Sequence, residues 1–441
     1  MLQALLNSLK IEDVRNKILL TLGLIAVYRL GSHIVVPGVD PELIAQRAST
    51  GGWMELADMF SGGAFSQFAI FSLGIMPYIS ASIMMQLLTA VIPHLEELKK
   101  EGQQGQQKIN QYTRYLTVGL SVVQGLGLAV QAGRTSVQIG NQTMFVAPST
   151  WSFRLIGMLT FTAGAVFIMW LGEQISEYGI GNGMSLIIYV AIIVQINTFF
   201  VSVLRGGAIG EFNPIELATL FSLLVALFVA CVWIQSAERR VPVKYARQVR
   251  GRKVYGGQGS HLPLKVDYSG VIAVIFASSV MLVPPMIYQL AVGQGAGAGW
   301  FADIMSWFQQ GTMLWALIFG GLIIFFCYFY TAITFNPTDI AENLKESGGF
   351  VPGRRPGKNT AEYIDKILTR ITLVGASVVA IISIVPVWMS DWFSVQLYFG
   401  GTSLLILVGV GLDFVQKLES QLLMRNYEGF LDSGKVKGRY G

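Results

Sequence analysis

The residue types that most often carry chemistry are sparse in this chain and stand apart from one another. The two cysteines, Cys231 and Cys327, lie in separate apolar runs, so neither a disulfide framework nor a thiolate metal site is predicted. The three histidines, His33, His94 and His261, form no ligand spacing such as HExxH. The sequence therefore predicts no metal site, no cofactor and no catalytic residues, and we do not expect an enzyme.

The glycine-rich run Gly179–Gly183 is the one stretch that resembles a phosphate loop. It lacks GxGxxG and Walker spacing and no strand precedes it, so we interpret it as a tight cytoplasmic turn between two membrane spans. Apart from Arg29, the apolar runs carry almost no charge away from their ends, whereas ion-coupled pumps need intramembrane charges. No Ser/His or paired-Asp arrangement of an intramembrane protease is present either.

Composition indicates that membrane lipid surrounds much of the chain. Of the 441 residues, 53% are hydrophobic and 13% are charged, against about 25% charged in soluble domains. A membrane helix needs about 20 apolar residues, and ten runs meet this length. We expect spans at about 18–36, 73–92, 113–132, 153–172, 184–203, 215–235, 270–292, 313–335, 367–388 and 398–416.

The distribution of Lys and Arg fixes the predicted orientation. Of the 31 basic residues, 26 fall in the N-terminal lead, three alternate loops and the C-terminal tail, which the positive-inside rule places in the cytoplasm together with both termini. Five spans per half imply that residues 1–210 and 211–441 have opposite topology, as in inverted repeats. The predicted fold class is an all-α polytopic membrane protein of ten transmembrane helices in two such halves.

The first outer loop contains a short, half-apolar stretch at about 57–70, which is too short to cross a bilayer. Because it leads directly into the second span, we interpret it as a re-entrant segment, a form tolerated where backbone is buried in protein or lines a cavity. The alternative is a helix that lies on the outer membrane surface.

Two cytoplasmic loops, at about 236–266 and 336–366, are longer than simple connections. The first alternates basic and apolar residues, which predicts a hairpin with one solvated face. The second presents two arginines between Pro-Gly pairs. Positive-inside bias with anionic lipid contact explains part of the charge; the excess favours an acidic or nucleic-acid partner. The candidate docking residues are Arg239, Arg240, Lys244, Arg247, Arg250, Arg252, Lys253, Arg354 and Arg355.

Uncharged polar residues also occur within the spans. They serve either as helix–helix hydrogen bonds or as a moderately polar lining or gate, and the sequence leaves both interpretations open. These residues are Gln86, Gln124, Gln195, Ser278 and Ser279.

Nine short stretches, in order along the chain, resemble the SecY family, the channel subunits of the bacterial Sec protein translocon. They are Met59–Ala64, Gly74–Ser82, Gln111–Tyr115, Trp170–Ile175, Gly179–Gly183, Leu262–Lys265, Phe335–Pro337, Val351–Gly357 and Phe399–Ile406. The resemblance covers essentially the whole chain. Two mild departures, Asp267 and Ala273, stand near the seventh span where the family pattern leads us to expect Asn and Pro.

The resemblance implies a role for each of these features. The re-entrant stretch resembles the family's plug, with Phe60, Ser61, Gly62, Gly63 and Phe65. A hydrophobic pore ring carries over onto Ile75, Ile79, Ile188, Ile275 and Ile406. A ring of branched apolar residues dewets and blocks ions, although without the resemblance each isoleucine alone is better explained by lipid or helix contact. The lateral gate carries over onto Gln86, Gln124, Ser278 and Ser279.

The resemblance further implies the setting in which the channel works. Expected partners are the SecE and SecG subunits, the SecA ATPase, the ribosome, signal sequences and nascent polypeptides, and anionic membrane lipids. The expected function is passive translocation of unfolded secretory polypeptides across the bacterial inner membrane, with lateral release of membrane-protein helices. The alternative is an inverted-repeat solute transporter, which would need midplane charges that the sequence lacks.

Overall fold

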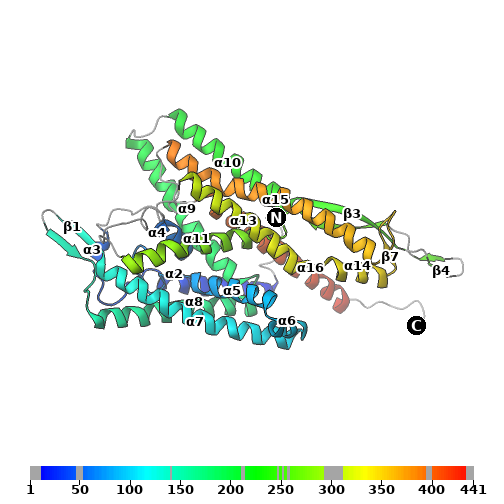
Figure 1. The fold of residues 1–441 in the computed structure, drawn as a ribbon, viewed down its shortest axis with the longest axis horizontal. Coiled ribbons are helices and arrows are strands. Elements are labelled where there is room, and N and C mark those ends of the chain that lie inside the picture. The colour runs from blue at the N-terminus through cyan, green and yellow to red at the C-terminus, as the bar shows by residue number, and fades with distance from the viewer. Residues whose placement is uncertain are drawn as a thin grey trace. The chain divides into compact units, whose positions relative to one another are not determined.

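The computed structural model describes residues 11–45, 53–139, 142–209, 214–245, 248–250, 253–255, 259–292, 311–393 and 400–433. These residues are mainly helical (Figure 1). The helices are α2 (Glu12–Gly31), α3 (Pro41–Ala45), α4 (Trp53–Ser61), α5 (Met76–Val91), α6 (Pro93–Lys100), α7 (Gln103–Arg134), α8 (Trp151–Tyr178), α9 (Gly183–Ile209), α10 (Pro214–Ser236), α11 (Gly270–Val292), α13 (Met313–Thr334), α14 (Pro337–Glu346), α15 (Lys358–Phe393) and α16 (Gly401–Ser433).

Seven short strands complete the described elements. They are β1 (Ser136–Ile139), β2 (Gln142–Phe145), β3 (Glu238–Tyr245), β4 (Gln248–Arg250), β5 (Lys253–Tyr255), β6 (Gly259–Lys265) and β7 (Gly349–Phe350). Strands β1 and β2 pair with each other, as do β4 and β5, and β6, β3 and β7 form a three-stranded antiparallel sheet in that order.

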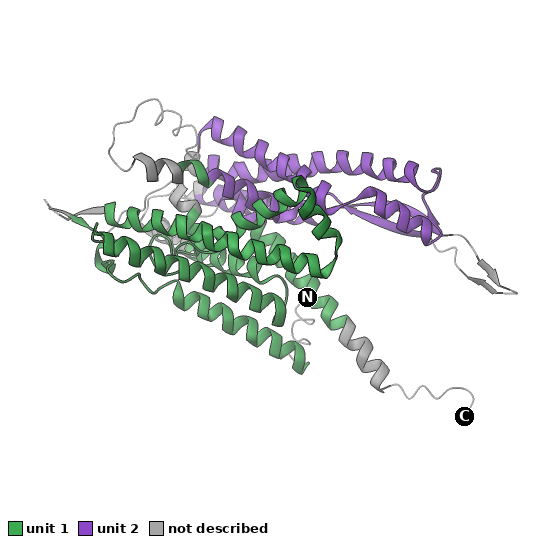
Figure 2. Cartoon of the chain, turned by 60° about the horizontal axis from the view of Figure 1, so that its bottom comes forward, with its two compact units in different colours: residues 1–201, 282–301, 406–441 green, residues 202–281, 302–405 purple. Residues whose placement is uncertain are grey.

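The chain divides into two compact units (Figure 2). Unit 1 comprises Met1–Val201, Leu282–Phe301 and Ile406–Gly441, and unit 2 comprises Ser202–Met281 and Ala302–Leu405. The predicted division into topological halves at residue 210 is a matter of repeat symmetry and stays a prediction.

Seven helices in the described residues are long and apolar enough to cross a membrane, and an eighth span results if the pair α5 and α6, bent by 98° at Ile92, is counted as one. The bend has a local cause, since Pro93 opens α6 and proline cannot donate to the preceding turn. Helix α2 carries five charged residues and α11 counts as a shorter apolar helix over Gly270–Pro285. The multi-pass prediction is confirmed, while the number ten stays a prediction.

Small residues allow the helices of unit 1 to approach closely. A Cβ added at Gly157 of α8 would come within 2.9 Å of the Ala129 Cβ on α7, and one added at Gly125 of α7 would lie 3.2 Å from the Met158 carbonyl oxygen. Glycine at such positions is typical of membrane helix interfaces, where backbone proximity replaces the hydrophobic effect as the source of association.

The apolar core of unit 1 lies under the first outer loop. Its largest fully buried members include Phe68 and Phe161, which belong to a cluster with Val36, Val146 and Phe153. This cluster joins the residues after α2 and α4 to α7, to the residues after β2 and to α8, so the chain between α4 and α5 is packed against protein.

Candidate functional site

The predicted plug residues lie at the end of α4 and in the turns that follow it, within unit 1. We call residues 57–70, the stretch predicted from the sequence, the re-entrant segment. Phe60 and Ser61 are fully buried, so the prediction of a segment buried in protein is confirmed. Gly62 and Gly63 have φ values of 67° and 91°, a left-handed conformation that ends a helix and that glycine adopts without strain.

A carboxylate ties the re-entrant segment to itself. Asp58 accepts hydrogen bonds from the Ser66 backbone N–H at 3.0 Å and from the Ser66 hydroxyl at 2.9 Å. The Ser61 hydroxyl oxygen accepts from the Phe65 backbone N–H at 3.0 Å. These bonds fold the chain after α4 back onto the helix, and the sequence pattern gave no sign of them.

Helix α2 also binds the re-entrant segment, through two hydrogen bonds. The Tyr28 hydroxyl donates to the Ser61 carbonyl at 3.0 Å, and Arg29 Nη1 donates to the Gly62 carbonyl at 3.0 Å. The sequence showed Arg29 only as a cation within the first predicted span, without a partner to explain it. Its acceptor lies 33 residues away and is a backbone oxygen, which no residue-type pattern could have identified.

The five isoleucines of the predicted pore ring are all buried, with exposed fractions between 0% and 8%. Ile75, Ile79, Ile188 and Ile406 belong to unit 1, and Ile275 belongs to unit 2. The re-entrant segment approaches the neighbours of two of them: a Cβ at Gly74 would lie 3.1 Å from the Phe60 carbonyl oxygen, and one at Gly62 would lie 3.0 Å from the Ala191 Cα.

The predicted lateral-gate residues satisfy much of their polarity within their own helices. The hydroxyls of Ser278 and Ser279 each donate to a carbonyl four residues earlier on α11, both at 2.8 Å. Gln86 Nε2 donates to the Ser82 hydroxyl on α5 at 3.4 Å. Gln86 and Gln124 lie in unit 1, while the two serines lie in unit 2, so their assembly into one gate remains a prediction.

The predicted hairpin after Ser236 is confirmed, while its cytoplasmic location stays a prediction. β3 and β6 pair over seven positions, with Val241 opposite Leu262. Along β3 the buried side chains are Val241 and Val243, and the alternate positions, which include Arg240 and Lys244, are exposed. Arg240 Nε forms an ion pair with Glu238 at 2.7 Å.

The sequence suggested two separate loops, yet the structure joins them. Lys244 of β3 pairs with Phe350 of β7, and an apolar cluster beneath the hairpin includes residues from both loops and from α15. Its buried members are Val241, Leu264, Phe335, Val351, Ile364 and Leu368. We call β3, β6, β7, α14 and the turn Val351–Gly357 the platform.

The two arginines of the platform turn differ in their contacts. The guanidinium of Arg354 lies over the Tyr363 ring, 5.0 Å from its centroid, which is the geometry of a cation–π interaction. The Arg355 side chain is exposed, and the Arg355 carbonyl accepts a hydrogen bond from the Thr360 hydroxyl at 2.9 Å. The remaining docking candidates Arg247 and Arg252 lie outside the described residues.

Of the other three docking candidates, Arg239 is exposed on β3, and Arg250 of β4 pairs in register with Lys253 of β5.

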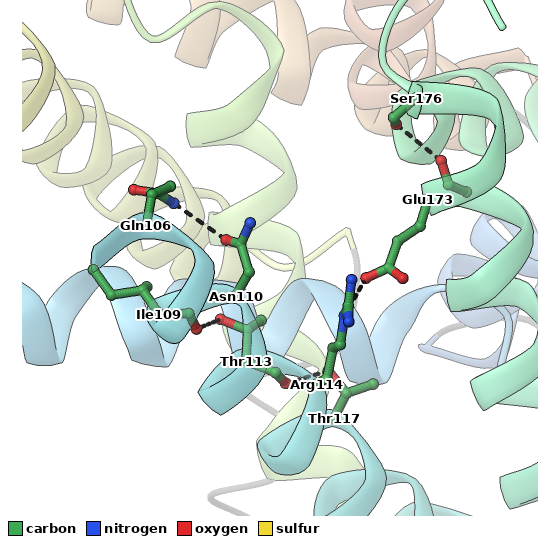
Figure 3. Close-up of polar contacts among 9 residues, drawn as sticks. Gln106, Ile109, Asn110, Thr113, Arg114, Thr117, Glu173 and Ser176 are labelled. Carbon is green, nitrogen blue, oxygen red and sulfur yellow. Dashed lines mark hydrogen bonds and ion pairs between the residues drawn. The ribbon is translucent and has the colours of Figure 1, made fainter. Parts of the chain in front are cut away.

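Two of the short stretches that carry the family resemblance meet through an ion pair. Arg114 Nε on α7 lies 2.7 Å from Glu173 Oε1 on α8, with the threonine row of α7 beside it (Figure 3). Thr113 and Thr117 each donate to the carbonyl four residues earlier. The ion pair fastens α7 to α8 at the end next to the Gly179–Gly183 turn, which connects α8 to α9 as predicted.

Comparison with solved structures supports the same architecture. A structure described as that of a protein-conducting channel superposes with a TM-score of 0.68 and 18% identity, covering 92% of this chain and 91% of that chain. A structure of Sec61 in a canine ribosome–channel complex gives a TM-score of 0.64 at 17% identity, with 92% and 91% covered. At such identity the likeness establishes the fold.

Comparison of sequences goes further. The chain is 45% identical to the protein translocase subunit SecY of Pseudomonas aeruginosa over 95% of this chain and 92% of that protein. It is 43% identical to the SecY subunit of Escherichia coli K12 over 97% and 96%. The SecY family model matches residues 69–415. The chain therefore belongs to the SecY family, and it is a multi-pass membrane protein that serves as the protein-conducting channel subunit of the Sec translocon.

Proposed function

We propose that the chain acts as a passive pore in which the re-entrant segment is the plug and Ile75, Ile79, Ile188, Ile275 and Ile406 form the constriction. The observation that carries this proposal is the position of the end of α4, at Phe60 to Gly62. Within unit 1 it lies against Gly74, which precedes Ile75, and against Ala191, one helical turn beyond Ile188. A plug seated beside apolar ring residues suits a pore that closes by dewetting and steric block.

The absence of charge supports a passive role. All five isoleucines are buried and apolar, so they offer neither ion ligands nor sequence-specific hydrogen bonds to a passing chain. Unfolded secretory polypeptides of any sequence could slide through such a ring, and membrane-protein helices would leave sideways at a gate that includes Gln86, Gln124, Ser278 and Ser279. The setting we propose is the bacterial inner membrane, with both termini cytoplasmic and with SecE and SecG as partner subunits.

The platform is the proposed docking surface for the SecA ATPase or the ribosome, which supply the energy. Exposed basic side chains above a buried apolar cluster form a rigid cationic surface. Such a surface fits acidic protein surfaces and ribosomal RNA phosphates, and its outer residues also suit anionic lipid headgroups.

Site-specific crosslinking tests the pore. We would place a photoreactive group at Ile188, reconstitute the chain with SecE and SecG, and stall a secretory polypeptide part-way across. Crosslinks between position 188 and the stalled chain are expected. The matched control is the same group at Ile193 on the same helix, whose side chain is 42% exposed and which should crosslink to lipid.

Each outcome of this experiment has a distinct meaning. Equal crosslinking at both positions would contradict a ring at Ile188. No crosslink at position 188 while the stalled chain is protected across the bilayer would place the pore elsewhere.

A further inference from the structure

Arg29 is a cation within the first predicted span, and its surroundings show what it binds. Guanidinium groups stay charged in proteins, and an unpaired charge at membrane depth is costly. In the described part of the chain, no carboxylate forms an ion pair with Arg29. Its contacts are the Gly62 carbonyl at 3.0 Å and, more weakly, His33 Nε2 at 3.4 Å.

The carbonyl oxygens that Tyr28 and Arg29 bind belong to neighbouring residues of the re-entrant segment. Tyr28 and Arg29 are consecutive on α2, and they bind the consecutive carbonyls of Ser61 and Gly62. Ser61 is the last residue of α4 and Gly62 follows it directly. The carbonyls at the end of a helix lack intrahelical donors and carry the negative end of its dipole. A cation at this position supplies the missing hydrogen-bond donors and also offsets the negative end of the dipole.

The backbone at Gly62 fits this position closely. Its φ of 67° is left-handed, and an added Cβ would lie 3.0 Å from Arg29 Nη1 and 3.0 Å from the Ala191 Cα. The end of α4 is therefore in contact with α2 on one side and α9 on the other. The carboxylate of the segment, Asp58, is occupied by Ser61 and Ser66, so Arg29 binds the segment through its backbone.

We propose that Arg29, assisted by Tyr28, is a latch. It holds the re-entrant segment in its closed position by binding the carbonyls of Ser61 and Gly62. When the segment leaves, Arg29 loses the Gly62 oxygen and remains as an uncompensated cation, which favours return of the segment. This inference rests on the proposed function of the segment as the plug. Arg29 is a positioning residue in this scheme and contacts no substrate.

Resting ion conductance in planar bilayers tests the latch, with the full chain reconstituted together with SecE and SecG and with no substrate present. Arg29→Met keeps an apolar stem and removes the donors. We expect the open fraction to rise about ten- to a hundredfold, the shift that loss of one charged hydrogen bond brings. Tyr28→Phe should give a smaller rise, and Arg29→Lys should restore part of the closure. Arg15→Met, an exposed arginine of the same helix, is the matched control and should change nothing.

A second set of variants separates a latch from a general structural role. In a chain that lacks residues 57–66, Arg29→Met should add no further conductance, because the element it holds is gone. An equal rise in that background, or with Arg15→Met, would overturn the latch. So would a silent Arg29→Met in the full chain while the deletion leaks. A deletion that does not leak would instead remove the plug assignment itself.

Discussion

The re-entrant segment and the platform are held in place by different combinations of contacts. The end of α4 is tied by directional bonds from Tyr28 and Arg29 to two carbonyls, while Phe65 and Phe68 after it pack into the apolar core of unit 1. The platform rests on a buried apolar cluster that includes Val241 and Leu264. Directional bonds are lost over a small displacement, whereas packing resists displacement over a whole surface. The end of α4, which we propose moves on opening, thus depends on directional bonds, whereas the proposed docking surface depends on packing.

Deletion of part of the re-entrant segment should have the largest effect on the channel. Deletion of residues 57–66 should allow ions to pass when a translocating chain opens the pore. The reason is that the apolar ring alone cannot seal the space around that chain. Single-channel recording with a stalled secretory polypeptide checks this. The full chain under the same conditions is the control, and unchanged conductance would contradict the plug assignment.

A cavity in the platform should cost stability. Leu264 is fully buried, and Leu→Ala changes at such positions cost about 2–5 kcal/mol. We expect Leu264→Ala to lower the free energy of unfolding of the detergent-solubilised protein by that amount and to make the hairpin sensitive to limited proteolysis. The neighbouring exposed residue provides the control, since Lys265→Ala should fall within about 0.5 kcal/mol of the parent. Equal losses for both variants would argue against a packed platform.

Charge reversal at the platform turn should act on partner binding and leave the fold intact. Arg355 is exposed, so Arg355→Glu should reduce SecA-driven export into vesicles about tenfold, the effect of about 1.4 kcal/mol at an interface, with normal amounts of folded protein. Lys358→Glu makes the same charge change three residues later, at the first turn of α15 where an acidic residue is favourable. Normal export with Arg355→Glu would exclude a docking role for this side chain.

The smallest expected effect concerns Asp267, which lies between the platform and α11. It accepts hydrogen bonds from the Ser269 hydroxyl and the Gly270 N–H, both at 2.8 Å, while its Oδ2 has no partner among the described residues. Burial disfavours the charged form and raises the pKa of the Asp267 carboxyl. The folded chain therefore binds this proton more tightly than the unfolded chain, and stability falls as pH rises above the ordinary aspartate pKa of about 4.

Asp267→Asn should remove that dependence. We expect the variant to be more stable at neutral pH by about 1 kcal/mol, the scale of one unsatisfied polar group, and its advantage should shrink as the pH falls toward 4. Thermal unfolding across this range measures both quantities. Glu346→Gln, an exposed acidic residue of α14, should show no such trend, and an Asp267→Asn profile parallel to the parent would refute the assignment.

Local periodicity predicted the elements well. The apolar run at 270–292 coincides with α11, and the alternation after Ser236 predicted the β3–β6 hairpin. What the sequence could not provide were pairings between distant positions: Arg114 with Glu173, and Lys244 with Phe350. Such contacts leave no periodic signal, because each depends on how whole helices or loops meet. The acceptor of Arg29 was invisible for the further reason that it is backbone.

The distribution of the two thiols gives the molecule a built-in reporter. Cys231 and Cys327 are free, buried and both in unit 2. A thiol reagent should therefore react very slowly with the folded protein. The rate of this reaction would measure how often unit 2 opens transiently. Because the sequence holds no other cysteine, a single cysteine introduced at an accessible position of unit 1 would be labelled against a dark background, so movements of the two units could be followed separately in one chain.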